Sequence, residues 1–177
     1  MTKGLRAALA GCLVSGALLV SAGGRAWATV GYADRARTVP GSAFVGSLAA
    51  WGLLALAGVV AVPATRRWGR VPVGGALVAA GATVAALTAA ALRDAEARAL
   101  AHEPLRRVTV PAGDVGLTAW PYVALAAGLL LAATGVLVAL RGPRWAALSA
   151  RYDVPAERPV TDADLWAAQD RGEDPTA

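Results

Sequence analysis

Four long stretches of this chain contain no charged residue, and together they cover more than half of its 177 residues. They are 18, 28, 22 and 26 residues long and run Ala7–Gly24, Thr38–Thr65, Val71–Leu92 and Val115–Leu140. A charged side chain at the bilayer centre costs roughly 2.5–3.5 kcal/mol on insertion scales, so such runs are typical of transmembrane helices. The sequence therefore predicts an all-α, polytopic integral membrane protein with a bundle of four transmembrane helices.

The composition agrees with this interpretation. Hydrophobic residues make up 56% of the chain and charged residues 16%, whereas soluble domains are roughly a quarter charged. The alternative, a soluble four-helix bundle, would need polar outer faces that these segments lack. The net charge of +5 does not indicate nucleic-acid binding, because the 17 basic residues are spread through loops and tails.

We expect a membrane domain of residues 1–145 and a cytoplasmic tail of residues 146–177. Pro40, Pro72 and Pro121 each lie near the beginning of an apolar stretch, where proline suits the first turn of a helix. The predicted spans are about 7–24, 42–64, 71–92 and 120–140. The last of these is about 30 Å long at 1.5 Å per residue, which matches the hydrocarbon core of a bilayer.

The distribution of Lys and Arg predicts the orientation. Ten basic residues lie on the side of the termini and the 66–70 loop, against seven on the other side. Residues close to the membrane count most, and that loop holds Arg66, Arg67 and Arg70 within five residues. We therefore expect a multi-pass protein of the plasma membrane with both termini in the cytoplasm.

Tryptophan residues mark the ends of the predicted spans. An indole ring favours the headgroup layer, so these residues are predicted membrane-interface anchors that bind the lipid bilayer. The four anchors are Trp27, Trp68, Trp120 and Trp145.

The first span has a second interpretation, as a cleaved secretory signal. Lys3 and Arg6, an apolar run and then Ala26-Trp27-Ala28 resemble a signal with an A-x-A site. The run of 18 residues is longer than the usual 7–15, and Arg25 and Trp27 crowd the site. An uncleaved first span is therefore preferred.

The spans contain no Asp, Glu, His or Lys, which argues against a proton relay. Their hydroxyl groups are expected to bond to their own helix or to bridge helices. They belong to Ser15, Ser21, Ser42, Ser47, Thr83, Thr88 and Thr134, with the Trp51 indole as a further polar group. Three pairs have the small-xxx-small spacing that allows close helix packing: Gly11 and Ser15, Gly75 and Ala79, and Gly128 and Ala132.

No catalytic, cofactor-binding or metal-binding constellation is recognisable, and we do not expect an enzyme. Zinc needs three or four ligands, but His102 is the only histidine and Cys12 the only cysteine. His102 is expected in a solvated loop of residues 93–114. The third helix is expected to continue about two turns into this loop, before Pro104 ends it.

The tail predicts a short amphipathic helix at about residues 162–171. Thr161 can cap it, and Asp162 and Asp164 suit its first turn. The helix carries three candidate partner-docking residues: Leu165, Trp166 and Gln169. Docking on a protein partner and docking on the membrane surface or the chain's own loops both remain open.

Several of these features resemble the tryptophan-biosynthesis-associated membrane protein family. They are Arg25-Ala26-Trp27 after the first span, Trp120-Pro121, Arg144-Trp145 before Arg151-Tyr152-Asp153, and the ending from Leu165-Trp166 through Asp170-Arg171-Gly172-Glu173-Asp174-Pro175-Thr176. The resemblance implies about four spans and a link to tryptophan biosynthesis, and it transfers no catalytic residue.

Two functions follow as hypotheses. The first is a non-catalytic membrane adaptor whose tail recruits a cytoplasmic protein, such as an enzyme of the pathway. The alternative is a transport or export component for tryptophan or a related small metabolite. The lack of charge within the spans favours the adaptor, and homo-oligomerisation is left open.

Overall fold

The computed structural model describes residues 3–31, 36–101, 115–145 and 170. Apart from Asp170, these residues lie in one compact unit, Met1–Ala146, and the tail forms a second unit, Ala147–Ala177. The predicted tail helix and its docking residues Leu165, Trp166 and Gln169 lie outside the described residues, as does His102.

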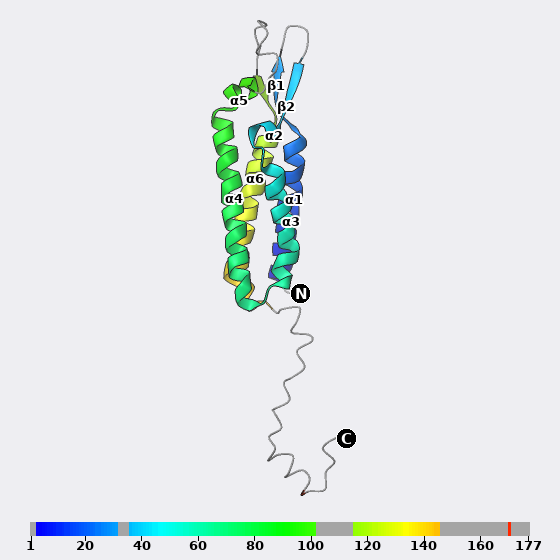
Figure 1. Ribbon diagram of the computed structural model, residues 1–177, viewed down its shortest axis with the longest axis vertical. Helices are drawn as coiled ribbons and strands as arrows, with labels where there is room; N and C mark the ends of the chain where they lie inside the picture. Colours follow the sequence, from blue (N-terminus) through cyan, green and yellow to red (C-terminus); the bar gives the residue numbers. More distant parts are fainter. Residues whose placement is uncertain (1–2, 32–35, 102–114, 146–169, 171–177) are drawn as a thin grey trace. The chain divides into compact units, whose positions relative to one another are not determined.

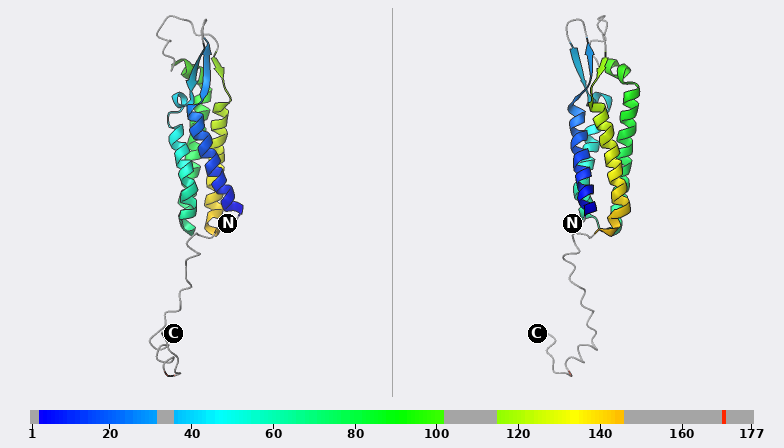
Figure 2. Two further views of the ribbon diagram at one scale, coloured as in Figure 1. Left: turned by 90° about the vertical axis from the view of Figure 1, so that its right-hand side faces the viewer. Right: turned by 180° about the vertical axis from the view of Figure 1, so that it is seen from behind.

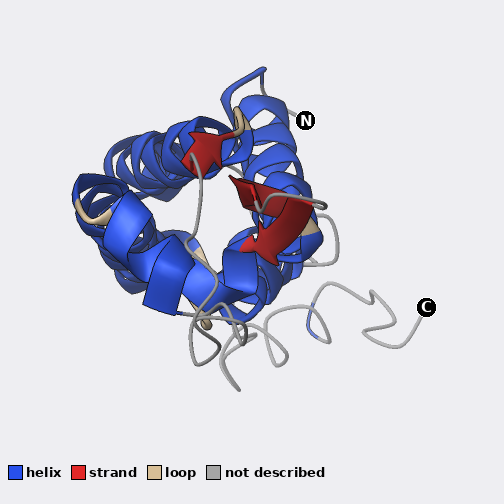
Figure 3. Cartoon of the chain, turned by 90° about the horizontal axis from the view of Figure 1, so that it is seen from above, coloured by secondary structure: helices blue, strands red, loops and turns tan. Residues whose placement is uncertain are grey.

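Four long helices of the first unit pack side by side (Figure 1). α1 contacts α3 and α6, and α4 contacts α6 and α3. Figure 3 shows the helices around a common axis. Their bounds are α1 Lys3–Gly24, α3 Leu48–Ala64, α4 Arg70–Arg93 and α6 Trp120–Arg141.

The space between the helices is filled mainly by apolar side chains. Large buried side chains include Leu19, Leu77, Leu131, Val84 and Val138, drawn from three of the helices. Outward-facing Leu and Val side chains are also common on α1, α3 and α6. Apolar residues on both faces are typical of a helix surrounded by lipid.

Among the residues that the structure describes, three helical segments are long and apolar enough to cross a membrane: Lys3–Gly24, Arg67–Arg93 and Trp120–Arg144. The second includes the short 3-10 helix η1, Arg67–Gly69, and the third includes η3, Gly142–Arg144. These segments agree with the predicted spans at 7–24, 71–92 and 120–140.

The predicted span at 42–64 differs from the structure. α3 has 17 residues, or about 26 Å, and is preceded by the separate short helix α2, Gly41–Phe44. Phe44 is buried, and its ring lies 5.5 Å from that of Trp27. Val45, directly after α2, has an extended backbone, so the apolar stretch does not form one continuous helix.

The prediction of an all-α fold is wrong in one respect, because a three-stranded antiparallel sheet lies at one end of the helices (Figure 2). Its strands are β1 Ala26–Gly31, β2 Ala36–Pro40 and β3 Val115–Leu117, in the order β2-β1-β3. Thr29 pairs with Thr38 on one side and Gly116 on the other. β2 and β3 include the first residues of two uncharged stretches, ahead of the helices. These residues include Thr38, Val39 and Val115, and Val and Thr favour strands.

The predicted extension of the third helix is present in a broken form. α4 ends at Arg93, Asp94 departs from helical geometry, and α5 follows as Ala95–Ala101. Ala95 and Ala99 are buried, and α5 packs against β1 and β3. The sheet, α2 and α5 thus form a cap on the helices, which we call the sheet end.

Candidate functional site

The opposite end of the helices is rich in basic residues, and we call it the basic end. It combines the beginning of α1, the turn between α3 and α4, and the end of α6 (Figure 1). Six of its cationic side chains are exposed: Lys3, Arg6, Arg66, Arg67, Arg141 and Arg144. The two acidic residues described in this unit, Asp94 and Glu96, lie at the sheet end.

Arg70 is the buried cation of the basic end, and it links three segments. Its Nε donates to the carbonyl oxygen of Val62 (3.1 Å), and one terminal nitrogen donates to those of Gly142 (2.9 Å) and Trp145 (2.7 Å). The carbonyl oxygen of Val62 also accepts from the Thr65 hydroxyl at 3.2 Å, and that of Gly142 from the Trp145 N–H at 3.0 Å. The guanidinium therefore joins the end of α3 to the end of α6 and its extension.

Trp145 completes this junction. Its ring is buried and lies against Gly4 of α1, where an added Cβ would come within 3.1 Å of the indole nitrogen. Gly142 is also tightly enclosed, because a Cβ there would lie 3.0 Å from Cβ of Arg70. The basic end is thus a packed junction of α1, α3, α4 and α6.

Close backbone contact between α4 and α6 holds the middle of the unit together. A Cβ on Gly74 would lie 2.6 Å from the backbone nitrogen of Ala139, and one on Gly135 would lie 2.6 Å from that of Val78. Two turns further along α4, Gly81 lies against the backbone of Ala132 and Gly128. Glycine permits this separation because it has no side chain.

This contact revises the predicted small-residue pairs. Gly128 and Ala132 do lie at the α4–α6 contact, and Gly11 lies against the side chain of Thr134. Gly75, however, has open space where its Cβ would be. The spacing identified the right type of contact, but the neighbouring residue Gly74 makes it.

At the sheet end, Trp27 is the central side chain. Its ring is 1% exposed, and its Nε1 donates to the carbonyl oxygen of Ala22 at 2.9 Å. Gly41 lies directly against this indole, and its N–H donates to the carbonyl oxygen of Arg25 at 2.9 Å. Trp27 therefore joins the end of α1 to α2.

Thr118 closes the same region from the other side. Its N–H donates to the carbonyl oxygen of Trp27 (2.9 Å), and its hydroxyl donates to that of Ala26 (2.7 Å). The Arg25 guanidinium lies 5.2 Å from the centre of the Trp120 ring, within range of a cation–π interaction. These contacts connect the beginning of α6 to the end of α1.

The hydroxyl groups within the helices follow the expected pattern in two cases. Ser15 donates to the carbonyl oxygen of Gly11 at 2.7 Å, and Thr134 donates to that of Leu130 at 2.8 Å. The Trp51 indole donates to the hydroxyl of Ser47 at 3.1 Å. Thr88 differs, because its buried hydroxyl has no hydrogen-bond partner among the described residues.

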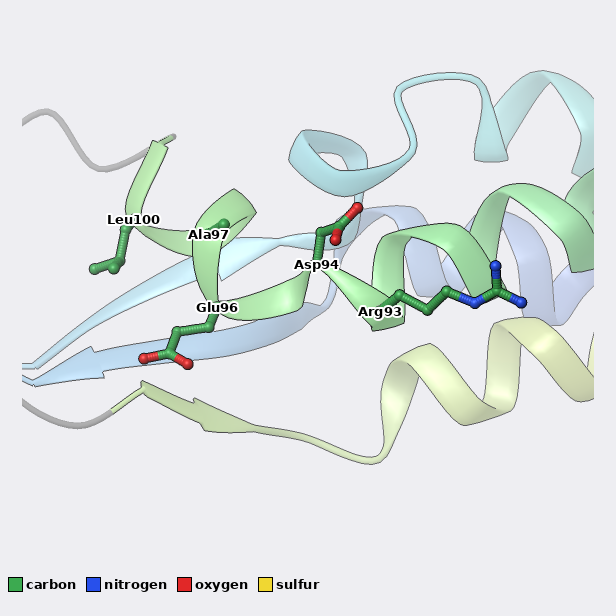
Figure 4. Close-up of a pocket in the computed structure, with 5 residues that line it drawn as sticks. All are labelled: Arg93, Asp94, Glu96, Ala97 and Leu100. Carbon is green, nitrogen blue, oxygen red and sulfur yellow. The ribbon is translucent and has the colours of Figure 1, made fainter.

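A shallow surface hollow of about 400 Å³ lies where α4 meets α5 (Figure 4). Its lining is Arg93, Asp94, Glu96, Ala97 and Leu100. Asp94 is 4.0 Å from Arg98, and both side chains are substantially exposed. Within the described ranges, no group of three or more His, Cys, Asp and Glu side chains is placed to hold a metal ion.

A protein-family model described as tryptophan-associated transmembrane protein (Trp_oprn_chp) matches residues 9–176. The chain belongs to this family. The match confirms the resemblance found in the sequence and, with the apolar helices, identifies a transmembrane protein. No curated protein matches the chain, and no solved structure does.

The predicted anchors of this family member have different surroundings. Trp68 is 75% exposed on the turn between α3 and α4, and Trp120 is partly buried beneath Arg25. Trp27 and Trp145 are buried and take part in packing. Little of their ring surface is exposed, and the interface role of all four residues stays a prediction.

The residues missed by the sequence analysis are Arg70 and Gly74. Arg70 looked like one of three loop arginines, and Gly74 like one of two adjacent glycines. Their positions on α4 separate them from their neighbours, because Arg70 and Gly74 are four residues apart on one face and both are buried. The sequence offered only their spacing of four, which places both on one face of a helix without telling that this face meets its neighbours.

Proposed function

We propose that this protein is a non-catalytic membrane adaptor associated with tryptophan biosynthesis. Its helices anchor it in the plasma membrane, and its tail recruits a cytoplasmic protein. The observation that carries this proposal is the contact between Arg70 and the carbonyl oxygen of Trp145 at 2.7 Å. Trp145 directly precedes the tail, so the buried guanidinium fixes the point at which the tail begins.

The packing of the helices supports an anchoring role. α4 and α6 meet backbone to backbone at Gly74, Gly81, Gly128 and Gly135. Leu and Val side chains fill the space between the helices. A bundle packed in this way is suited to holding a rigid shape in lipid, where close contact of small residues stabilises helix pairs.

The extent of the family match supports a role for the tail. The matching region continues to residue 176, and so includes Leu165, Trp166 and Gln169. A tail that belongs to the family's shared sequence is a better candidate for recruitment than an appended segment. The name of the family supplies the link to tryptophan.

The adaptor requires the tail to lie in the cytoplasm, and we propose four spans with both termini on that side. α3 has 17 residues, which is at the lower limit of about 17–25 for a span. The concentration of cations at the basic end favours a cytoplasmic location for it. A reporter fused after Ala177 that is active only in the cytoplasm tests this orientation, and an inactive, stably expressed fusion contradicts it.

Recruitment is tested by purifying the protein from native membranes in mild detergent. Full-length protein is compared with a chain ending at Pro159 and with the double variant Leu165→Ala/Trp166→Ala. Val154→Ala is the matched control, since it shortens another apolar side chain of the tail. We expect an enzyme of tryptophan synthesis to be recovered with the full-length and control proteins and lost from the other two. Equal recovery with the double variant would reject the adaptor.

The second candidate function is transport or export of tryptophan or a related small metabolite. The observation in its favour is the buried hydroxyl of Thr88, which has no partner among the described residues and could serve a passing polar group. This function predicts a difference in metabolite efflux between strains with and without the protein. Equal efflux, measured at equal intracellular metabolite concentration, would exclude it.

A further inference from the structure

The exposed cations of the basic end come from three separate parts of the chain. Lys3 and Arg6 lie on the first turns of α1, Arg66 and Arg67 on the turn after α3, and the remaining two at the end of α6. η1 and η3 are in contact, which brings the turn close to the end of α6. Their charges therefore add in one region.

These cations stand on a rigid frame. Arg70 holds the carbonyl groups of Val62, Gly142 and Trp145, and the Trp145 ring packs against Gly4. Each of the three basic segments is thereby tied to the others. A ligand that bridges them does not have to order them first, which reduces the entropy cost of binding.

Apolar side chains adjoin the charges. Val60 is 70% exposed and Leu140 67% exposed on the last turns of α3 and α6. Trp68 is 75% exposed between Arg67 and Arg70. A surface that passes from exposed aliphatic side chains through an indole to guanidinium groups matches the order of acyl chain, interface and phosphate in a lipid leaflet.

The sheet end lacks this combination. Two of its described cations lie near groups that offset them: Arg25 over the Trp120 ring, and Arg98 near Asp94 at 4.0 Å. Glu96 adds a second carboxylate there. At the basic end, the described residues include no carboxylate, so the charge compensation must come from outside this unit.

We propose that the basic end binds the headgroups of anionic phospholipids, with Arg66 and Arg67 contacting the phosphate and Trp68 lying beside the glycerol region. Lipid is favoured over an acidic protein because the cations adjoin exposed apolar side chains at the ends of membrane helices. This inference goes beyond the adaptor and does not depend on the tail.

The test uses full-length protein in detergent micelles, which have no inside or outside and so remove any effect of orientation. Phosphatidylglycerol or phosphatidylcholine is added, and bound lipid is counted by native mass spectrometry. The variant is Arg66→Gln/Arg67→Gln. The matched control is Arg37→Gln/Arg93→Gln, which removes two exposed arginines from the sheet end. We expect the first variant to bind phosphatidylglycerol about tenfold more weakly and the control to bind it normally.

Unchanged binding by Arg66→Gln/Arg67→Gln would overturn the proposal. An acidic protein surface would then be the alternative ligand of these cations. An equal loss in both double variants would also overturn it, because it would reflect net charge alone. If the first variant does not fold, Arg6→Gln/Arg141→Gln provides the same comparison at the basic end.

A second measurement locates the lipid. The difference in tryptophan fluorescence between the unsubstituted protein and Trp68→Phe gives the contribution of Trp68. Brominated phosphatidylglycerol should quench this contribution more strongly than brominated phosphatidylcholine. Equal quenching by the two lipids would contradict a preference at this turn.

Discussion

The two ends of the helices meet the same physical requirement with different chemistry. Carbonyl groups at helix ends have no partner within the helix and need other donors when they are buried. At the basic end, one guanidinium donates to Val62, Gly142 and Trp145, and the Thr65 hydroxyl and the Trp145 N–H add a second donor to the first two. At the sheet end, the Trp27 indole, backbone N–H groups and the Thr118 hydroxyl share the task.

This difference indicates how each end responds to mutation. At the basic end, the Arg70 side chain links α4 to α3 and to the extension of α6, so its loss affects several segments together. The sheet end combines hydrogen bonds with burial of a large ring and strand pairing, so loss of one polar contact there leaves others in place. The free energy of unfolding, measured in mixed micelles, can separate these two cases.

The largest effect is expected for Trp27→Ala. It removes the buried ring that contacts Phe44 and Gly41, and such truncations cost about 3–5 kcal/mol. Trp27→Phe keeps an aromatic ring but loses the hydrogen bond to Ala22, so it should cost about 1–2 kcal/mol. Equal losses for the two variants would mean that the hydrogen bond, and not burial, holds the sheet end.

Arg70→Met should lower the free energy of unfolding by about 3 kcal/mol, because it removes the hydrogen bonds from a buried cation to three backbone carbonyl groups. The Val62 and Gly142 carbonyl groups keep the Thr65 hydroxyl and the Trp145 N–H as donors. Arg67→Met is the control, since Arg67 is exposed on the preceding turn, and it should change stability by less than about 0.5 kcal/mol. Similar losses in both variants would show that positive charge, and not the buried contacts, matters at this end.

The combination of Trp27→Ala with Arg70→Met sharpens the comparison further. α6 has 22 residues, so the two ends are separated by about 33 Å. Effects at sites this far apart usually add within about 0.5 kcal/mol. A larger deviation from additivity would reveal that the two ends are energetically coupled through the helices.

Between the ends, Gly74→Ala should destabilise the protein by about 1–3 kcal/mol, because its Cβ would collide with the backbone of α6. The adjacent Gly75→Ala meets open space and should be neutral or stabilising by up to about 1 kcal/mol, since alanine favours a helix. Thermal unfolding of the two variants in the same detergent distinguishes them. Destabilisation by Gly75→Ala would indicate an unrecognised contact, such as a second copy of the chain.

The smallest effect is expected for Arg25→Gln. It removes the guanidinium over the Trp120 ring, an interaction worth about 0.5–1 kcal/mol at an exposed site. A decrease of more than about 2 kcal/mol in the free energy of unfolding would mean that Arg25, like Arg70, is a structural cation. The contrast between the two ends would then be weaker.

Much of the helical framework could be predicted from the sequence. The absence of charge located α1, α4 and α6. Pro72 and Pro121 lie in the first turns of α4 and α6 as predicted, whereas Pro40 ends β2. The spacing of small residues correctly indicated close packing at Gly128 and Ala132. It selected Gly75 in place of Gly74, because residue spacing alone does not tell which face of a helix meets its neighbour.

The sheet end was harder to predict. β1 contacts β2 nearby in the chain, but β3 begins more than eighty residues after β1 ends. Short strands of this kind depend on pairing with distant residues, and an isolated strand carries little signal. The predicted spans at 42–64 and 120–140 therefore left β2 and β3 outside, but no strand was predicted there.

The sequence by itself determined that this is a transmembrane protein of the tryptophan-associated family. Charged residues are costly in lipid, so each span can be recognised locally as a stretch without charge. The tertiary structure decided which arginine is buried, which glycines touch and how the segments between spans pair. These properties depend on residues far apart in the chain, since a buried guanidinium or a close backbone contact is defined by the partners that folding brings to it.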